Sequence, residues 1–271
     1  VTSQGLMTRM GTIHAATWYR FVLDEAHYAR NPKTRLFMRC NRLTAGTKWM
    51  LSATPILNKA EDLMSLLRLA CKLGGRTNKL AKIKKLRDTF LLRRTKEEIN
   101  RPLPPLVIQN KLCRFLSEDE ELFYSQVEQS TSQAFNAAMK RGDVDIFILE
   151  LLTRLRQCTL HPQMVIDGYK KKGIFNQDLP DWDAKTTKIH YLEKIIKKEL
   201  AEMPDQRKII FCQYHKEIAM IQEMLTENGY TSEVYSGKTD QETRKAILSG
   251  IIQPQFLLIQ IRAGGAGLNL Q

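Results

Sequence analysis

Two adjacent carboxylates, Asp24 and Glu25, come directly after the apolar run Phe21–Leu23. Such a run is typical of a buried strand, and the ligands of parallel sheets bind where the strands end. One carboxylate there can hold Mg²⁺ through water molecules, and its neighbour can orient a water that attacks a terminal phosphate. The pair fits phosphoanhydride hydrolysis, although taken alone it is more typical of a solvated acidic turn.

Two hydroxyl residues follow a second apolar run in the same way. Ser52 and Thr54 come directly after Trp49–Leu51. If the two runs form neighbouring strands, we expect the hydroxyls to bond the acidic pair across the strand ends. Serine and threonine also cap helices and form turns, so this segment alone is weak support, and it gains strength from its order and spacing relative to the first.

The elements around these segments alternate between strand and helix patterns. Apolar residues recur at helical spacing over 57–70, and Asn58 is the expected N-cap. A second alternating region begins near residue 186, and Gly229 is expected to end one of its helices. Its expected strands are 208–212, 232–235 and 256–261, and its expected helices are 189–200, 218–225 and 239–248. This alternation predicts a parallel α/β sheet in each region.

The sequence between these two regions is mainly helical in pattern. Ser117 and Glu120 form a capping-box pattern that opens a helix toward Lys140, and residues 145–158 form a second amphipathic segment. Residues 168–185 are polar and contain Pro180, which predicts a linker or exposed loop.

The composition predicts two domains and a polyanionic partner. The chain has 271 residues, of which 43% are hydrophobic, so extensive disorder is excluded, and it lacks an apolar run long enough to cross a membrane. Five scattered cysteines indicate a reducing compartment. The net charge is +13, and residues 72–101 alone contain eleven basic and three acidic residues. A nucleic acid suits this concentration of charge, and a merely soluble basic protein is the alternative.

Seven segments in order resemble the motifs of the Swi/Snf family of superfamily-two, helicase-like ATPases, which translocate on double-stranded DNA. The segments span nearly the whole chain and are residues 21–27, 51–58, 61–67, 90–96, 155–162, 208–213 and 263–270. The resemblance implies an α/β fold with two RecA-like lobes, both incomplete here, joined by a helical protrusion, with ATP and Mg²⁺ bound between the lobes. The implied divisions are 1–73 for the first lobe, 74–165 for the protrusion and linker, 166–185 for a loop, and 186–271 for the second lobe.

The resemblance implies specific roles in the first lobe. Asp24 would bind Mg²⁺ through water and Glu25 would activate the attacking water. His27, Ser52 and Thr54 would couple the state of the nucleotide to the grip on DNA.

The resemblance also implies roles in the last segment. Arg262, Gly264 and Gly265 would approach the DNA backbone, because a bare glycine backbone allows close approach. Gly267 and Asn269 would lie near the ribose of ATP. Glycines at the start of a helix are also common packing devices, so taken alone they do not decide between these interpretations.

Two basic residues near the protrusion are expected to make structural or interlobe contacts. Arg93 and Arg94 lie beside the apolar residues Leu91 and Leu92, whereas the neighbouring lysines fit either DNA contact or a solvated helix face.

Two other patterns resemble functional motifs but are incomplete. Residues 236–239 contain the Gly-Lys-Thr of a phosphate loop, but Ser232 stands where the pattern needs its first glycine. Cys158 and His161 have the spacing of metal ligands without a second pair, so His161 is expected to end a helix.

The family's phosphate loop would precede Val1 and its arginine finger would follow Gln271. We therefore expect the 271-residue chain alone to hydrolyse ATP weakly or not at all. Two alternatives remain open, a non-catalytic DNA-binding remnant and an RNA helicase of the Asp-Glu-Ala-His type. The expected partners are duplex DNA and DNA-bound proteins such as a nucleosome or polymerase, and the expected location is the nucleus or a site of viral replication.

Overall fold

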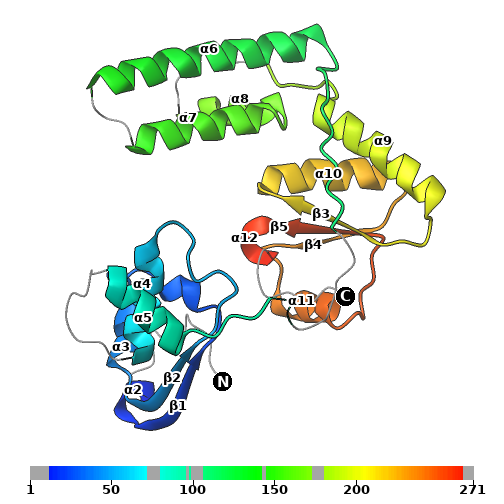
Figure 1. Cartoon of the computed structure of the whole chain (residues 1–271). Helices are drawn as coiled ribbons and strands as arrows, with labels where there is room; N and C mark the ends of the chain where they lie inside the picture. The colour runs from blue at the N-terminus through cyan, green and yellow to red at the C-terminus, as the bar shows by residue number, and fades with distance from the viewer. Residues whose placement is uncertain are drawn as a thin grey trace. The chain divides into compact units, whose positions relative to one another are not determined.

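The computed structural model in Figure 1 describes residues 12–71, 80–95, 98, 106–141, 145–172 and 180–264. The chain divides into two compact units, Val1–Val107 and Ile108–Gln271. Each unit has its own parallel sheet and its own core, which confirms the α/β fold class expected from the sequence. The finer division into lobes, protrusion and loop stays a prediction. Within the described residues, each helix is too short or too polar to cross a membrane.

The sheet of the first unit consists of two parallel strands. β1 is Trp18–Leu23 and β2 is Ala45–Met50, and Leu23 pairs with Met50, so both strands end at the same edge. The expected neighbouring parallel strands are therefore present. Leu51 directly follows β2, and its N–H still donates to the Leu23 carbonyl oxygen at 2.9 Å.

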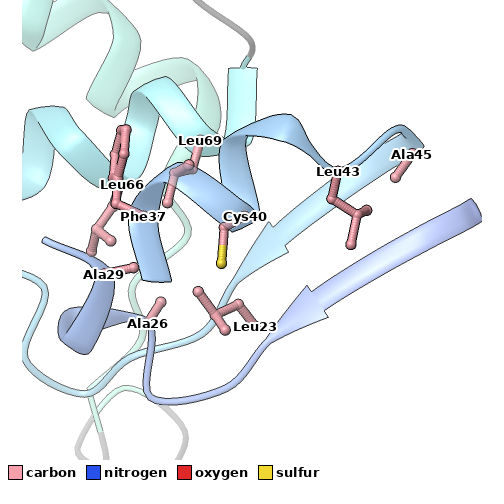
Figure 2. Close-up of a cluster of buried hydrophobic side chains, with 9 residues drawn as sticks. All are labelled: Leu23, Ala26, Ala29, Phe37, Cys40, Leu43, Ala45, Leu66 and Leu69. Carbon is pink, nitrogen blue, oxygen red and sulfur yellow. The ribbon is translucent and has the colours of Figure 1, made fainter. Parts of the chain in front are cut away.

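One face of this sheet is covered by helices. Figure 2 shows side chains from β1, β2, η1 (Ala26–Ala29), α3 (Arg35–Arg42) and α4 (Ala60–Cys71) packed into one cluster. The unit also contains α2 (Thr12–Ala15) and α5 (Leu80–Phe90). Trp18, Val22 and Trp49 on the other face are exposed. The expectation of two buried strands is wrong for this face, because the core cluster of the described residues packs against the opposite face.

The second unit contains a three-stranded parallel sheet in the order β3-β5-β4. The strands are β3 (Lys208–Cys212), β4 (Ser232–Tyr235) and β5 (Phe256–Gln260). The helices around them are α9 (Thr187–Glu202), α10 (His215–Glu227), α11 (Gln241–Leu248) and α12 (Ile261–Gly264). Alternate β5 residues face opposite cores, so α9 and α10 cover one face and α11 lies on the other (Figure 1). Gly229 follows α10 with φ +77°, which confirms the expected helix end.

Three helices precede this sheet in the second unit. They are α6 (Glu118–Arg141), α7 (Asp145–Cys158) and α8 (Pro162–Lys172). Ser117 Oγ accepts the Glu120 N–H at 3.2 Å, as expected for a cap. The Glu120 carboxylate instead accepts hydrogen bonds from Thr187, which corrects the expected reciprocal capping box. α8 also shows that the first part of the expected 168–185 loop is helical, because Val165 anchors it in a core with Val127 and Cys158.

The start of α4 also differs from the expectation. The helix begins at Ala60, and Asn58 is not its N-cap. The carboxylate of Asp62 accepts the N–H groups of Leu57, Asn58 and Lys59 at 3.2, 2.9 and 3.4 Å. A carboxylate in the first helical turn thus replaces the expected amide cap.

Candidate active site

The candidate site of the first unit lies at the carboxyl edge of β1 and β2. Two backbone hydrogen bonds extend the pairing beyond the strands, from Leu51 N–H to the Leu23 oxygen at 2.9 Å and from Ala26 N–H to the Leu51 oxygen at 2.8 Å. These bonds hold the segment containing Asp24 and Glu25 against the segment that leads into Ser52. The sequence predicted this proximity, and the structure contains it.

The turn after β1 places Glu25 in an unusual backbone conformation. Its φ and ψ are 48° and 46°, in the left-handed region, and Glu25 is the sole described non-glycine residue with a positive φ. The Asp24 Oδ1 accepts the Glu25 N–H at 2.9 Å, which stabilises the turn. A residue in this region carries backbone strain that the surrounding structure must hold, and such strain is concentrated at functional sites.

His27 connects the acidic pair to the hydroxyl segment. Its Nδ1 lies 3.2 Å from Glu25 Oε2 and 3.2 Å from Ser52 Oγ. Ser52 Oγ also accepts the Thr54 N–H at 3.2 Å. The contact expected directly between the hydroxyls and the acidic pair is therefore made through the imidazole of His27. A change in the position of the Glu25 carboxylate can reach the 52–54 segment through this ring.

Asp62 is a further residue of this site that was not predicted from the sequence. It is buried, and its three backbone hydrogen bonds hold residues 57–59, which follow Thr54 and Pro55. The Asn58 N–H is the main cause that lowers the pKa of Asp62, and the positive charge of Arg30 adds to it. The position of Asp62 near the start of the predicted 57–70 helix could have indicated this role, because an acidic side chain there can accept hydrogen bonds from the N–H groups of the first turn.

The donor chemistry at this edge fits Mg²⁺. Asp24 is exposed and supplies hard carboxylate oxygen, and Mg²⁺ in phosphate-handling sites uses one or two carboxylates together with water and phosphate. Within the described residues, acidic, histidine and cysteine side chains do not gather in groups of three or more that could hold a metal.

The carboxyl edge of the second sheet carries a basic residue after each strand. Lys216 is in the first turn of α10 after β3, and exposed Lys238 follows β4. Arg262 is exposed on α12 directly after β5, and Gly264 is buried at the end of that helix. Of the other predicted site residues, Gly265, Gly267 and Asn269 lie outside the described residues. Lys216 and Lys238 were not among the residues predicted from the sequence, although each lies a few residues after a predicted strand.

The segment Ser236–Thr239 forms a turn bonded to itself. Thr239 Oγ1 accepts the Ser236 N–H at 3.0 Å and donates to the Val234 oxygen at 2.8 Å, while Ser236 Oγ accepts the Lys238 N–H at 3.2 Å. Both hydroxyls are thus used in local structure, and this arrangement favours a connecting turn over a phosphate cradle.

Cys158 and His161 have separate structural surroundings. Cys158 is buried, and burial raises the pKa of its thiol to about 12. The His161 N–H donates to the Gln157 oxygen in the last turn of α7 at 3.0 Å, as expected for a residue that ends this helix, and its Nδ1 also accepts the Gln163 N–H at the start of α8, at 3.2 Å. Burial is the main cause that lowers the pKa of His161.

Arg93 and Arg94 follow α5 and are exposed. Their expected interlobe or structural contacts stay a prediction.

The chain matches two protein families. Residues 1–74 and 70–164 match the SNF2-related domain, and residues 187–271 match the helicase conserved C-terminal domain. Since these matches cover most of the chain, it belongs to the SNF2-related family of helicase-like ATPases. The family resemblance recognised from the motifs is confirmed.

Similar proteins come from a virus, a plant and humans. The chain is 27% identical to the "Probable global transactivator" of Orgyia pseudotsugata multicapsid polyhedrosis virus, over 97% of the chain and 55% of the viral protein. It is 36% identical to the "DNA repair protein RAD5A" of Arabidopsis thaliana, over 57% of the chain and 17% of that protein. It is 24% identical to the human "SWI/SNF-related matrix-associated actin-dependent regulator of chromatin subfamily A member 1", over 93% of the chain and 26% of that protein. The chain therefore spans about half or less of these relatives' lengths.

Among solved structures, the chain is similar to the "Sulfolobus solfataricus SWI2/SNF2 ATPase core in complex with dsDNA". The sequence identity is 22% and the TM-score is 0.43, with 95% of this chain and 57% of that chain covered.

Proposed function

We propose that the full protein is an ATP-dependent translocase on double-stranded DNA that remodels protein–DNA complexes. The observation that carries the proposal is the continuous contact from Glu25 through His27 to Ser52. A motor protein must convert hydrolysis into the movement of another segment. The contact through His27 would allow this, because it joins the proposed hydrolytic carboxylate of Glu25 to the segment 52–54.

The proposed chemistry assigns different tasks to the two carboxylates. Asp24 would hold Mg²⁺, which neutralises phosphate charge when it is bound. Glu25 would orient the attacking water and accept its proton, and the contact of its Oε2 with His27 Nδ1 holds the carboxylate. A shift of the Glu25 carboxylate would move the His27 ring and, through it, Ser52. The Thr54 N–H, which donates to Ser52 Oγ, would move with it.

The proposed DNA surface is the carboxyl edge of the second sheet. Lys216, Lys238 and Arg262 place one positive charge after each strand, which suits a row of phosphates. The predicted contacts of Gly264 and Gly265 would lie at the same strand end as Arg262. Contacts with phosphates carry little sequence information, so a translocase that acts at many DNA sites can use them.

The proposed partners are duplex DNA and proteins bound to it, such as a nucleosome or a polymerase. The nucleus, or a site of viral replication, is the corresponding location. Relatives named as a DNA repair protein, a regulator of chromatin and a viral transactivator support this range.

The test is ATP hydrolysis by the full-length protein with duplex DNA, with single-stranded RNA and without nucleic acid. Duplex DNA is expected to stimulate hydrolysis more than RNA. Glu25→Gln keeps the shape of the side chain, removes its basic charge, and is expected to slow hydrolysis about 10²- to 10⁴-fold. Glu118→Gln, an exposed residue of α6, is the matched control and should leave the rate unchanged.

Two results would overturn the proposal. Stronger stimulation by single-stranded RNA would indicate an RNA helicase. Duplex binding without hydrolysis in the wild-type protein would indicate a non-catalytic remnant.

A further inference from the structure

A charged network joins α8 to α10 in the second unit. The Lys216 Nζ donates to Asp167 Oδ2, and Gln163 Nε2 donates to Asp167 Oδ1 at 2.9 Å. The same Gln163 nitrogen donates to Asp181 Oδ1 at 2.6 Å, and Lys170 Nζ lies 3.0 Å from that oxygen. Within this network, Asp167 is the residue that binds the ammonium group of Lys216 at the carboxyl end of β3.

The ion pair occupies a position that DNA would use. Lys216 lies in the first turn of α10, on the edge that also carries Lys238 and Arg262. At the end of β3, Lys216 contacts the carboxylate of Asp167, which belongs to another helix, α8. A carboxylate and a phosphate ester offer the same kind of anionic oxygen to an ammonium group, so both cannot hold Lys216 fully at once.

We propose that Asp167 is a built-in competitor of DNA phosphate for Lys216. In the DNA-free protein the carboxylate holds the ammonium group, and a phosphate of duplex DNA takes its place when DNA binds. This inference rests on the DNA-binding part of the proposed function and adds a regulatory contact between α8 and the DNA-binding edge.

The surroundings of the pair make the exchange possible. The side chains of Lys216 and Asp167 are 39% and 45% exposed, so a phosphate can reach the ammonium group without unfolding either helix. Gln163 keeps its hydrogen bond to the Asp167 carboxylate after Lys216 leaves. Val165 remains buried in the core with Val127 and Cys158, so α8 keeps its place on α6 and α7. The moving part is the flexible lysine side chain.

The same network supplies a matched control. Asp181 carries the same charge and contacts Gln163 and Lys170. Its substitution by asparagine removes one negative charge from the network and leaves the Asp167 pair with Lys216 in place. A general electrostatic effect would therefore raise DNA affinity equally in Asp167→Asn and Asp181→Asn.

The test is duplex DNA binding by the 271-residue chain, measured by fluorescence anisotropy over a series of salt concentrations. Asp167→Asn is expected to raise the affinity about two- to fivefold, the range for releasing one exposed ion pair. Its log–log salt slope is expected to stay that of the wild type, because the same phosphate contact with Lys216 forms in both complexes. Asp181→Asn should raise the affinity less.

A double-mutant cycle with Lys216→Gln decides whether the effect passes through Lys216. When Lys216 is already replaced, Asp167→Asn is expected to raise the affinity no more than Asp181→Asn does. An equal gain in both backgrounds, or an equal gain in Asp181→Asn, would overturn the competition. Failure of the wild-type chain and every variant to bind duplex DNA at low salt would overturn the DNA-binding proposal itself and, with it, this inference. Binding by the wild type without a gain in Asp167→Asn would overturn this inference alone.

Discussion

At the scale of single residues, Glu25 combines a proposed catalytic role with a strained backbone. Its side chain contacts His27 and its φ is 48°, where a Cβ atom is unfavourable. Replacing Glu25 by alanine keeps this strain and removes the carboxylate, whereas glycine removes both. We expect Glu25→Gly to be more stable than Glu25→Ala by about 1 kcal/mol. Urea denaturation of the two variants measures the difference, and an alanine variant of equal or greater stability would contradict the strain.

Asp62 is expected to make the first unit sensitive to acid. Its pKa is lowered from 3.8 in the folded protein, mainly by the Asn58 N–H, so the charged form is the one that folding favours. The stability from this group is fully present above about pH 4, the ordinary aspartate pKa, and is lost as the pH falls through the lower folded-state value.

Asp62→Asn should therefore reduce stability at neutral pH and weaken its dependence on pH in the acid range. Thermal unfolding between neutral pH and pH 3 measures both effects. Asp88→Asn is the control, because Asp88 is in an exposed pair with Arg87, and exposed pairs contribute little. An Asp62→Asn chain with the acid profile of the wild type would exclude this role.

At the scale of elements, α3 depends on a buried cation from the neighbouring strand. Lys48 of β2 is 7% exposed, and its Nζ donates to the carbonyl oxygens of Cys40 and Asn41 at 2.8 and 3.3 Å. These carbonyls lie in the last turn of α3, where a helix runs out of its own N–H donors. The lysine thus fastens the helix that covers the sheet to the strand that leads into Ser52.

Lys48→Met keeps the length of the side chain and removes these donors. We expect it to destabilise the first unit by about 1–3 kcal/mol, because the buried Cys40 carbonyl and the part-buried Asn41 carbonyl lose a charged partner. Chemical denaturation measures the change, with Lys33→Met at an exposed position as the control. Equal stability of the two variants would mean that the contact contributes nothing.

A second contact between elements joins α6 to α9. The buried carboxylate of Glu120 accepts hydrogen bonds from Thr187 N at 3.0 Å and Thr187 Oγ1 at 2.6 Å. The Leu116 N–H donates to the same hydroxyl at 2.8 Å. Two helix starts far apart in the sequence are held together by one threonine.

At the scale of the whole molecule, the two units are expected to unfold separately. The described core clusters each lie within one unit, so the loss of one core does not by itself expose the other. Calorimetry of the chain should show two transitions. Lys48→Met should lower one of them, and Thr187→Val, which removes a donor from buried Glu120, should lower the other. A single transition that moves in both variants would show that the units unfold together.

Much of the fold was predictable because strands and helices follow local patterns. The runs before Asp24 and Ser52 indicated neighbouring parallel strands, and the strands of the second sheet were placed within a residue of their ends. The misplaced cap at Asn58 and the helix in the 168–185 segment have a common cause. In both, the deciding contact was made by a residue that the prediction did not consider, Asp62 inside the predicted helix in one case and buried Val165, which packs with distant residues, in the other.

The sequence by itself determined which groups are available for chemistry, because Asp24, Glu25, His27 and Ser52 lie in segments whose order and spacing mark the family. The tertiary structure alone decided which groups touch. Packing placed His27 between Glu25 and Ser52, Lys216 beside Asp167, and Thr187 against Glu120. The physical reason is the distance in sequence over which each effect acts. Local propensity acts over a few residues, whereas a buried polar group bonds whichever partner packing brings within reach.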